Sequence, residues 1–369
     1  MKGLTGFSLT LVVCLCIAAV SAFGQSATRV SAGFTHKNLT IYLIHEANTS
    51  SSLDLLTLQE AMEMKIFIVY ETEDVNELIV ENISPDHDVF IQAGDIVKGG
   101  KQDRVLAISV IIPRLSGKVS IEAFCVESDR WEGRGEESKK VFSSAEARIV
   151  SRELKIATYG DPSGKISGSG SGQGSGGGSG SASGLEVGNG NGVASGRGSQ
   201  TQVWNEVANA QRNISNNVMV DVTANSSASS LQLSLENKKL EKATAEFVKK
   251  LADITKGKND VIGYAFAING KINSADIYLS NHLFTKLWPK MLKAAVTEAI
   301  SLADKPKART EPTAAAISKF LADADRGVKK ERQTVAKSKV VTRASKNEAV
   351  YEARDKADLV VHRNYVKLR

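Results

Sequence analysis

Cysteine is scarce in this sequence, which has three among 369 residues. Cys14 and Cys16 lie in an N-terminal segment with the layout of a secretory signal peptide, so a mature chain would retain Cys125 alone. An internal disulfide is therefore excluded, and a chain of this length can bury a core large enough to need none. Cys125 lies in the apolar run VSIEAFCVE, and we interpret it as a buried small side chain rather than a nucleophile.

Long apolar runs are also missing after residue 24. The first segment has a cationic start at Lys2 and an apolar core over Leu9–Val20, which is shorter than the roughly 18 residues of a membrane-spanning helix. We therefore expect a cleaved signal peptide over residues 1–24, with export to the periplasm or the medium and no transmembrane segment in the mature chain. Lipoprotein anchoring through Cys14 or Cys16 is the alternative, and it is disfavoured because the apolar run continues past both residues.

The sequence lacks the short motifs that reveal a reaction. It contains no G-x-S-x-G, H-E-x-x-H, Walker or CxxC pattern. The spacing of its histidines is unlike that of a zinc or iron site; these are His36, His45, His87, His282 and His362. We expect no metal and no cofactor, and the motifs leave the reaction, if there is one, open.

A segment rich in glycine and serine divides the chain. Residues 163–198 contain 24 Gly and Ser in 36 positions. Such a composition buries too little apolar surface to offset the entropy of ordering, so we expect a disordered segment. Length alone allows it to be a linker between two domains or an insertion into one.

The residues before this segment favour strands. Six short β-branched runs are separated by turn residues, namely KNLTIYLI, KIFIVY, NELIVENI, DVFIQ, RVLAISVIIP and KVSIEAFCV. A helix is expected over Leu56–Met64. The regular spacing of the runs predicts a β-rich half over residues 25–162, organised as a sandwich or a barrel.

The residues after it, 199–369, favour a mixture of helices and hairpins. Apolar residues recur at helical spacing in TQVWNEVANAQRN and in LEKATAEFVKKLADI. Asn269-Gly270 lies between two apolar runs and predicts a tight hairpin. A long helix should follow, kinked or restarted at Pro289, then a helix over Thr313–Ala324 and three strands. The fold class is therefore α+β, with a β-rich first half packed against a mixed second half.

The C-terminal end is basic. Residues 305–369 contain 17 Lys and Arg against 8 Asp and Glu. Basic residues at strand edges prevent edge-to-edge aggregation, and we prefer this interpretation to a polyanion site. Because no aromatic-interleaved basic face accompanies them, nucleic acid is not the expected partner.

One polar loop requires an explanation. Within the stretch AGDIVKGGKQDRVL, the seven residues KGGKQDR place three cations, one carboxylate and two adjacent glycines between apolar runs. The glycines allow close approach of the backbone to a ligand, and N–H groups near them could bind an anion. The candidate ligand-binding residues are Asp95, Lys98, Lys101, Gln102, Arg104, Glu127, Arg130 and Trp131. In the competing interpretation Arg104 pairs with Glu127 or Asp95 and Gln102 caps the backbone, so that the cluster only fixes the fold.

The same stretch carries a family resemblance. GDIVKGGKQDRVL, SVIIP and IEAFCVESDRWE resemble the ARG and Rhodanese-Phosphatase-superfamily-associated Protein domain family, in which ARG stands for ADP-ribosylglycohydrolase. Similar blocks follow the Gly/Ser-rich segment: QTQVWNEV, GYAFAINGKINSADIYLSNHLFTKLWPKML and VVHRNYVKL. Asp95 stands where the family usually has Glu, and the Gly/Ser-rich segment is extra to the family's spacing. The resemblance implies that the segment is an insertion and that the two halves form one unit.

The resemblance implies a context of ADP-ribose metabolism and no assigned activity. We therefore expect an exported ligand-binding domain for an anionic, nucleotide- or ADP-ribose-like small molecule. A hydrolase acting on such a ligand, with Asp95 and Glu127 as acid and base, is one alternative. A structural or interaction protein of the cell envelope is the other. The oligomeric state is left open.

Overall fold

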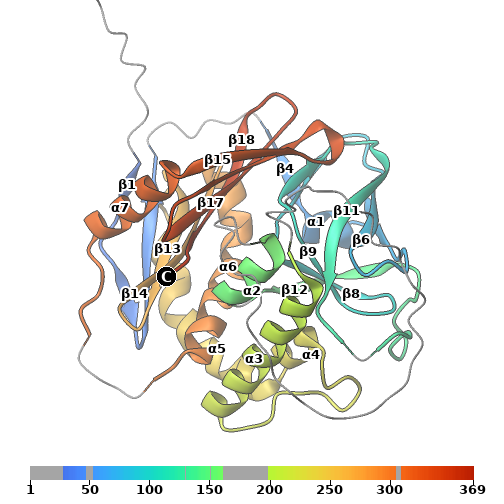
Figure 1. The fold of residues 1–369 in the computed structure, drawn as a ribbon, viewed down its shortest axis with the longest axis horizontal. Coiled ribbons are helices and arrows are strands. Elements are labelled where there is room, and N and C mark those ends of the chain that lie inside the picture. Colours follow the sequence, from blue (N-terminus) through green and yellow to red (C-terminus); the bar gives the residue numbers. More distant parts are fainter. Residues whose placement is uncertain (1–27, 47–52, 129, 150, 161–197, 305–308) are drawn as a thin grey trace, which may run out of the picture.

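A computed structural model describes residues 28–46, 53–128, 130–149, 151–160, 198–304 and 309–369. The predicted signal peptide and nearly all of the Gly/Ser-rich segment lie outside these residues. The described chain has an α+β fold in which the N-terminal half is rich in strands and the longer helices belong to the C-terminal half (Figure 1). The predicted fold class is confirmed.

The N-terminal half forms a barrel-like sheet of six strands. Their spatial order is β12 (Phe142–Arg148), β8 (Asp95–Gly99), β9 (Arg104–Leu106), β11 (Gly117–Cys125), β6 (Glu77–Asn82) and β5 (Phe67–Tyr70). A bridge between Tyr70 and Val141 brings the two edges of this sheet together. A second sheet shares its apolar core and contains β10 (Val110–Ile112), β7 (Asp88–Ile91) and β4 (Leu55–Thr57), which leads into α1 (Leu58–Glu63).

A larger sheet joins the two halves of the chain. Its order is β1 (Arg29–Val30), β3 (Leu39–His45), β13 (Val261–Ile268), β14 (Lys271–Tyr278), β18 (Val360–Lys367), β17 (Glu348–Arg354), β16 (Lys339–Ala344) and β15 (Val328–Gln333), with β2 (Phe34–His36) paired to β3. Strand β3 lies antiparallel beside β13, so a strand from the first half is hydrogen-bonded within the sheet of the second.

Helices cover both faces of this sheet (Figure 1). The inner face packs against α6 (Asn281–Ser301), which in turn contacts α5 (Lys238–Leu251) and α3 (Gln200–Val218). The outer face is covered by α7 (Ala314–Asp325). The short helices α2 (Arg152–Tyr159) and α4 (Leu231–Leu235) and the 3-10 turns at Ala252–Thr255 and Val335–Lys337 complete the fold.

Local sequence signals explain several element boundaries. Asn269 and Gly270 have φ of 55° and 74° and join β13 to β14, so the predicted hairpin is confirmed. Thr313 caps α7 by accepting a hydrogen bond from the backbone of Ala316. Helix α6 continues through Pro289, where a kink or a restart had been expected.

Candidate functional site

The predicted polar loop is the turn between β8 and β9, and its backbone donors are occupied by the protein's own carboxylates. Gly99 N–H donates to Asp103 Oδ1 at 3.0 Å, and Lys101 N–H donates to Glu71 Oε2 at 2.9 Å. Both glycines of the turn have positive φ, as the predicted anion-binding turn requires. The anions that these donors bind in the structure are therefore internal.

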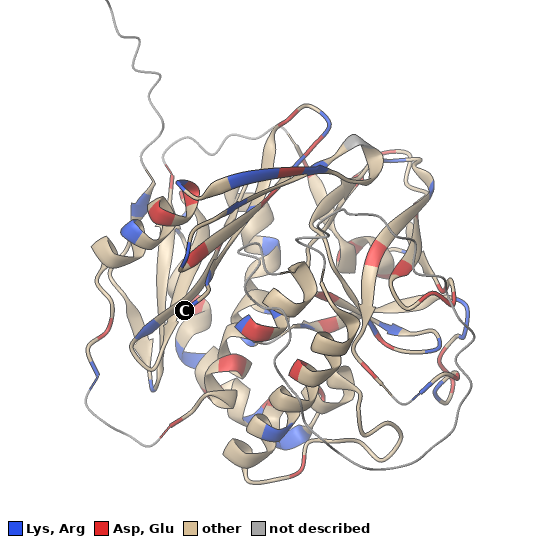
Figure 2. Cartoon of the chain, in the orientation of Figure 1, with Lys and Arg blue, Asp and Glu red and all other residues tan. Residues whose placement is uncertain are grey.

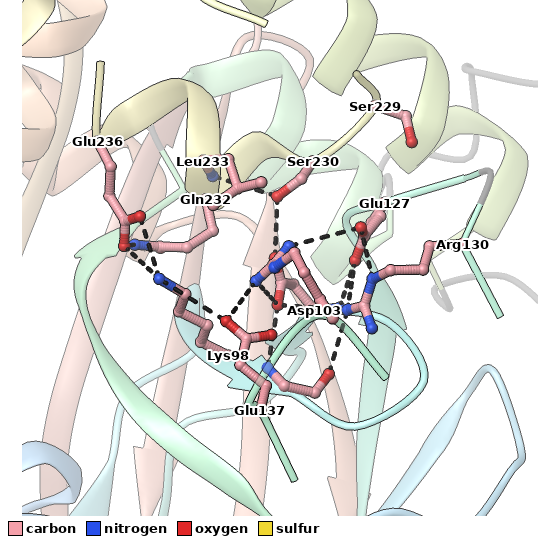
Figure 3. Close-up of polar contacts among 12 residues, drawn as sticks. Lys98, Asp103, Glu127, Arg130, Glu137, Ser229, Ser230, Gln232, Leu233 and Glu236 are labelled. Carbon is pink, nitrogen blue, oxygen red and sulfur yellow. Dashed lines mark hydrogen bonds and ion pairs between the residues drawn. The ribbon is translucent and has the colours of Figure 1, made fainter. Parts of the chain in front are cut away.

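Behind the turn lies a buried ion cluster made of Asp103, Glu127, Arg130 and Arg134. Asp103 and Glu127 have fully buried side chains, and the two arginine side chains are about one-tenth exposed. Arg130 binds both oxygens of Glu127, each at 2.7 Å, and Arg134 binds both oxygens of Asp103, each at 3.1 Å. Figure 3 shows Asp103, Glu127 and Arg130 facing one another, with Ser230 donating to Asp103 Oδ2 at 2.9 Å.

This environment shifts the two acids in opposite directions. Burial raises the pKa of Asp103, and its pairing with Arg134 offsets only part of the effect. Burial acts on Glu127 in the same sense, but hydrogen bonds from Arg130 and from the Asp103 backbone outweigh it and lower the pKa of Glu127. Two acids and two guanidiniums in close contact make a network that fixes the conformation of the loop.

Arg104 belongs to a separate contact set on the other side of the turn. Its side chain has no exposed surface and donates to Glu71 Oε1 at 3.0 Å and to Cys125 Sγ at 2.7 Å. The partner is thus Glu71, where the sequence had suggested Glu127 or Asp95. Lys101 pairs with the exposed Glu73 at 3.0 Å and lies over the ring of Trp131, which is 44% exposed.

The remaining predicted residues are Gln102, Lys98 and Asp95, and Lys98 lies 3.8 Å from Glu137, an acid that also pairs with Arg134. Gln102 is buried, and its Oε1 has no hydrogen-bond partner among the described residues. Lys98 binds Glu236 at 2.9 Å and borders a pocket of about 820 Å³ between β12 and the helices α4, α5 and α6. Asp95 pairs with Lys290, which lines the same pocket, at 3.2 Å. Asp95 and Glu127 therefore lie in different networks.

A different pocket lies under the C-terminal strands, and polar side chains at its base could take part in a reaction. It has a volume of about 550 Å³ and lies between the Ala107–Ser109 segment, Tyr159 and the strands β15 to β18. Its walls include the aromatic pair Tyr159 and Tyr351, whose ring centroids are 5.0 Å apart. We call it the sheet pocket.

Three side chains form a hydrogen-bonded chain at the base of the sheet pocket. Ser109 Oγ lies 3.1 Å from His362 Nδ1, and His362 Nε2 lies 3.0 Å from Asp276 Oδ1. Ser109 lines the pocket, whereas His362 and Asp276 are buried behind it. Asn364, which also lines the pocket, donates to Asp276 Oδ1 at 2.7 Å. A hydroxyl, an imidazole and a carboxylate in this order form the constellation of a serine nucleophile.

The groups around the hydrogen-bonded series of Ser109, His362 and Asp276 favour an ionised Asp276. Burial alone would raise the pKa of Asp276, but the hydrogen bond from His362 and the nearby Lys155 and Arg148 hold it well below its usual range. An anionic Asp276 requires the proton on His362 Nε2, which leaves Nδ1 to accept from the Ser109 hydroxyl. The tautomer thus follows from the chemistry of the partners.

Further buried ionisable groups lie around the hydrogen-bonded series of Ser109, His362 and Asp276. Arg148 is fully buried and donates to the carbonyl oxygen of Ala93 at 2.7 Å. Lys155 donates to Ser274 Oγ at 3.0 Å, and burial lowers the pKa of Lys155. Burial raises the pKa of Tyr264, Tyr278 and Glu298. Such a concentration of perturbed groups beside a pocket is typical of functional sites.

Sequence reasoning missed this site because its parts are far apart. Ser109 and His362 are separated by 253 positions, and no short motif links them. One usable signal was the pair His362 and Asn364, two polar residues on one face of the apolar run VVHRNYV.

Neither a metal centre nor a membrane helix emerges from the part of the chain that the structure describes. No group of three or more His, Cys, Asp and Glu side chains there is arranged to hold a metal ion. No helix there is both long and apolar enough to cross a bilayer.

Comparison with known proteins gives one match. No curated protein and no solved structure is significantly similar to the chain. A family model matches residues 27–368, which include both halves and the segment between them. The chain therefore belongs to the ARG and Rhodanese-Phosphatase-superfamily-associated Protein domain family.

Proposed function

We propose that this protein is a hydrolase of small esters that acts at the sheet pocket. Ser109 is the nucleophile, His362 the general base, and Asp276 the residue that orients His362. The observation that carries the proposal is the unbroken hydrogen-bond chain from Ser109 through His362 to Asp276 at the base of the pocket.

In the first step Ser109 Oγ attacks the ester carbonyl carbon, and its proton passes to His362 Nδ1. The bond from the carbonyl carbon to the alcohol oxygen then breaks, and the leaving alkoxide takes the proton from His362. Water, deprotonated by the same imidazole, hydrolyses the acyl-enzyme and releases the carboxylic acid. The ionised Asp276 stabilises the imidazolium formed in each half.

A binding domain without turnover is the second candidate. The backbone N–H of Ala93 donates to Ser109 Oγ at 3.0 Å, and Ser109 is only 9% exposed. A hydroxyl held by two partners also suits a static polar network that orients a ligand. The loop of the first cluster fits this second role less well, because its cations are paired with the protein's own acids.

The test uses a fluorophosphonate, which reacts with activated serines whatever the natural substrate. Ser109 Oγ should displace fluoride and form a phosphonate ester that peptide mass spectrometry locates. His362→Gln should slow the labelling on the order of a hundredfold, since the general base is lost. Asp276→Asn should slow it as well, because the amide cannot stabilise the imidazolium.

The control is Ser143, an exposed serine on β12 whose hydroxyl donates to the Lys98 carbonyl. Ser143 should stay unlabelled, and Ser143→Ala should label at Ser109 like the wild type. If the folded wild type is not labelled at Ser109, the hydrolase is wrong. A ligand that then raises the melting temperature would support the binding domain.

We also propose that the protein is exported. The cationic start and short apolar core of residues 1–24 support this proposal. Mass spectrometry of the protein recovered from its native host should find an N-terminus near residue 25, and an intact Met1 would contradict export.

A further inference from the structure

One wall of the sheet pocket contains a tyrosine that is tied to the surroundings of Ser109. The Tyr159 hydroxyl donates to the carbonyl oxygen of Ala93 at 3.0 Å, and the backbone N–H of Ala93 donates to Ser109 Oγ at 3.0 Å. Because a single residue links these two hydrogen bonds, the Tyr159 hydroxyl lies within roughly 10 Å of the proposed nucleophile. The Tyr159 ring therefore borders the space that a substrate of Ser109 would occupy.

A second tyrosine packs against the first from the other half of the chain. The Tyr351 hydroxyl donates to the carbonyl oxygen of Gly160 at 2.8 Å, and the Tyr159 and Tyr351 ring planes are inclined at 67°. Both hydroxyl hydrogens are thus used by backbone acceptors, which fixes the orientation of the rings. Both tyrosines line the pocket and are partly exposed, so ring surface is what they offer to a ligand.

Small and apolar side chains complete this part of the lining, namely Ala93, Ala107, Ile108, Val340 and Ala353. Two aromatic planes that meet at an angle form a corner. A third ring can stack on one tyrosine there and meet the other edge-on, an arrangement that the charge distribution of aromatic rings favours. A saturated ring of the same size would fill the space without this electrostatic gain.

The charged residues of the lining are already engaged within the protein. Glu331 is paired with two lysines, and Arg332 is paired with Glu122. Glu352 is held by three arginines, and Lys330 has an interaction of its own as well. Figure 2 shows both signs of charge along β15, at the edge of the large sheet. A charged substrate group would have to displace one of these contacts, whereas an uncharged group would not.

We infer that the substrate is an uncharged ester that carries an aromatic ring, and that this ring packs against Tyr159 and Tyr351. This inference rests on the proposed function and specifies its substrate class. Recognition through ring surface predicts that a flat aromatic group is preferred to a saturated ring of similar size and apolarity.

The experiment compares two fluorophosphonates that differ only in one ring, which is phenyl or cyclohexyl. A two-carbon spacer holds the ring away from phosphorus, so that the intrinsic reactivity of the two reagents is the same. Each reagent is made with the ring on the carbon arm and on the alkoxy arm, since either side of an ester can face the tyrosines. On the wild type, the phenyl reagent should label Ser109 on the order of tenfold faster in at least one of the two forms.

A third reagent tests the uncharged character of the substrate. It carries a carboxylate on the phenyl ring and is otherwise identical to the phenyl reagent. It should label Ser109 on the order of tenfold more slowly, because the carboxylate loses water without gaining an unpaired cation among the described lining residues.

Variants of Tyr351 test the origin of the preference. Tyr351→Leu should bring the ratio of the phenyl and cyclohexyl labelling rates close to one, because leucine is apolar but has no ring. Tyr351→Phe should keep most of the preference, since the ring and its contact with Tyr159 remain. The matched control is Tyr70→Leu on β5, where the tyrosine packs with Lys118 and donates to Glu81. Tyr70→Leu should leave the ratio unchanged, and melting temperatures verify that the variants fold.

The outcomes separate this inference from the proposed function. Equal labelling of the wild type by the phenyl and cyclohexyl reagents in both forms overturns the inference, leaves the nucleophile in place and depends on no variant. An unchanged ratio in folded Tyr351→Leu also overturns it, because the preference would then arise elsewhere. A carboxylate reagent as fast as the phenyl reagent overturns the uncharged substrate. If no reagent labels Ser109, the proposed function itself is wrong, and the inference falls with it.

Discussion

Arg104 shows how much a single residue can depend on one partner. Its guanidinium has no exposed surface, and Glu71, the acid that neutralises it, is about 3% exposed. Lys101, three positions earlier, pairs with Glu73, which is 68% exposed. These two cations looked alike in the sequence. Their burial separates them, and burial depends on tertiary contacts that no local pattern encodes.

Arg104→Ala should therefore lower the free energy of unfolding by about 3–5 kcal/mol, because it leaves the buried carboxylate of Glu71 unpaired. Lys101→Ala should cost about 1 kcal/mol or less, since its ion pair is solvated. Urea unfolding of the two variants measures both. Similar losses in the two variants would contradict the distinction.

The burial of Cys125 can be tested through the pH dependence of the free energy of unfolding. Burial raises the pKa of the Cys125 thiol to about 12, partly opposed by Arg104. The folded state therefore holds this proton more tightly than the unfolded chain, whose thiol titrates near pH 8.5–9. The stabilisation is complete below that pH and is lost as pH rises toward 12.

Between pH 8 and pH 10 the wild type should thus lose about 1–2 kcal/mol more stability than Cys125→Ala does. Urea unfolding at the two pH values gives this difference, and groups common to both proteins cancel. If the stability of the wild type and of Cys125→Ala changes equally with pH, burial does not protect the thiol from ionisation.

Among the elements, those with apolar alternation or a clear turn signal were predictable. The runs NELIVENI and KVSIEAFCV became β6 and β11, and Asn269-Gly270 became the β13–β14 turn. Strands β12 and β15 were missed as separate strands because FSSAEAR and VKKERQ contain too few apolar residues to reveal a buried face. Both lie at the end of a strand order. Strand β12 packs Phe142 and Ala145 into the apolar core, whereas β15 has no buried residue and is held by its pairing with β16.

The turn between β7 and β8 positions both the polar base of the pocket and the barrel. Its Gly94 has φ of 94°, and a Cβ there would come within 2.8 Å of Arg148 Nη2 and of Ile149 Cγ1. Gly117 also has positive φ, 62°, but nothing lies within 4 Å of its Cβ position. Alanine substitutions at Gly94 and Gly117 can therefore be compared to separate the cost of backbone strain from the cost of steric crowding.

Gly117→Ala should cost about 1–2 kcal/mol, the strain of a left-handed alanine. Gly94→Ala should cost roughly 2 kcal/mol more, because the buried Arg148 and Ile149 must also move. It should also slow labelling of Ser109, whose hydroxyl is held by the adjacent Ala93 N–H. If urea unfolding gives the two variants the same loss of stability, then Arg148 and Ile149 can move away from the new methyl group at position 94 without cost.

At the scale of the molecule, the reaction centre is assembled from both halves of the chain. Ser109 comes from the β-rich half, and His362 and Asp276 come from the large sheet. The family resemblance predicts one unit spanning the Gly/Ser-rich segment, which stays a prediction, and the family model matches residues 27–368. The position of the site was not predictable, because it arises only where the two halves meet.

The flanks of the Gly/Ser-rich segment lie close together, with Ser199 N–H donating to the Ala157 carbonyl at 3.1 Å. Replacing residues 161–197 by a linker of five residues should therefore preserve the fold. Each halving of loop length contributes about 0.6 kcal/mol, so the shortened chain should be about 2 kcal/mol more stable. Calorimetry measures the change, and loss of a cooperative transition would show that the segment is structural.

The pairing of β3 with β13 has a consequence for the order of events during synthesis. Residues 39–45 leave the ribosome early, yet their hydrogen-bonding neighbour at 261–268 is translated more than 200 residues later. At about 5–20 residues per second, β3 waits on the order of tens of seconds with an unpaired apolar edge. That interval is a window for chaperones to bind the nascent chain, and one in which a premature partner strand from another copy would be most damaging.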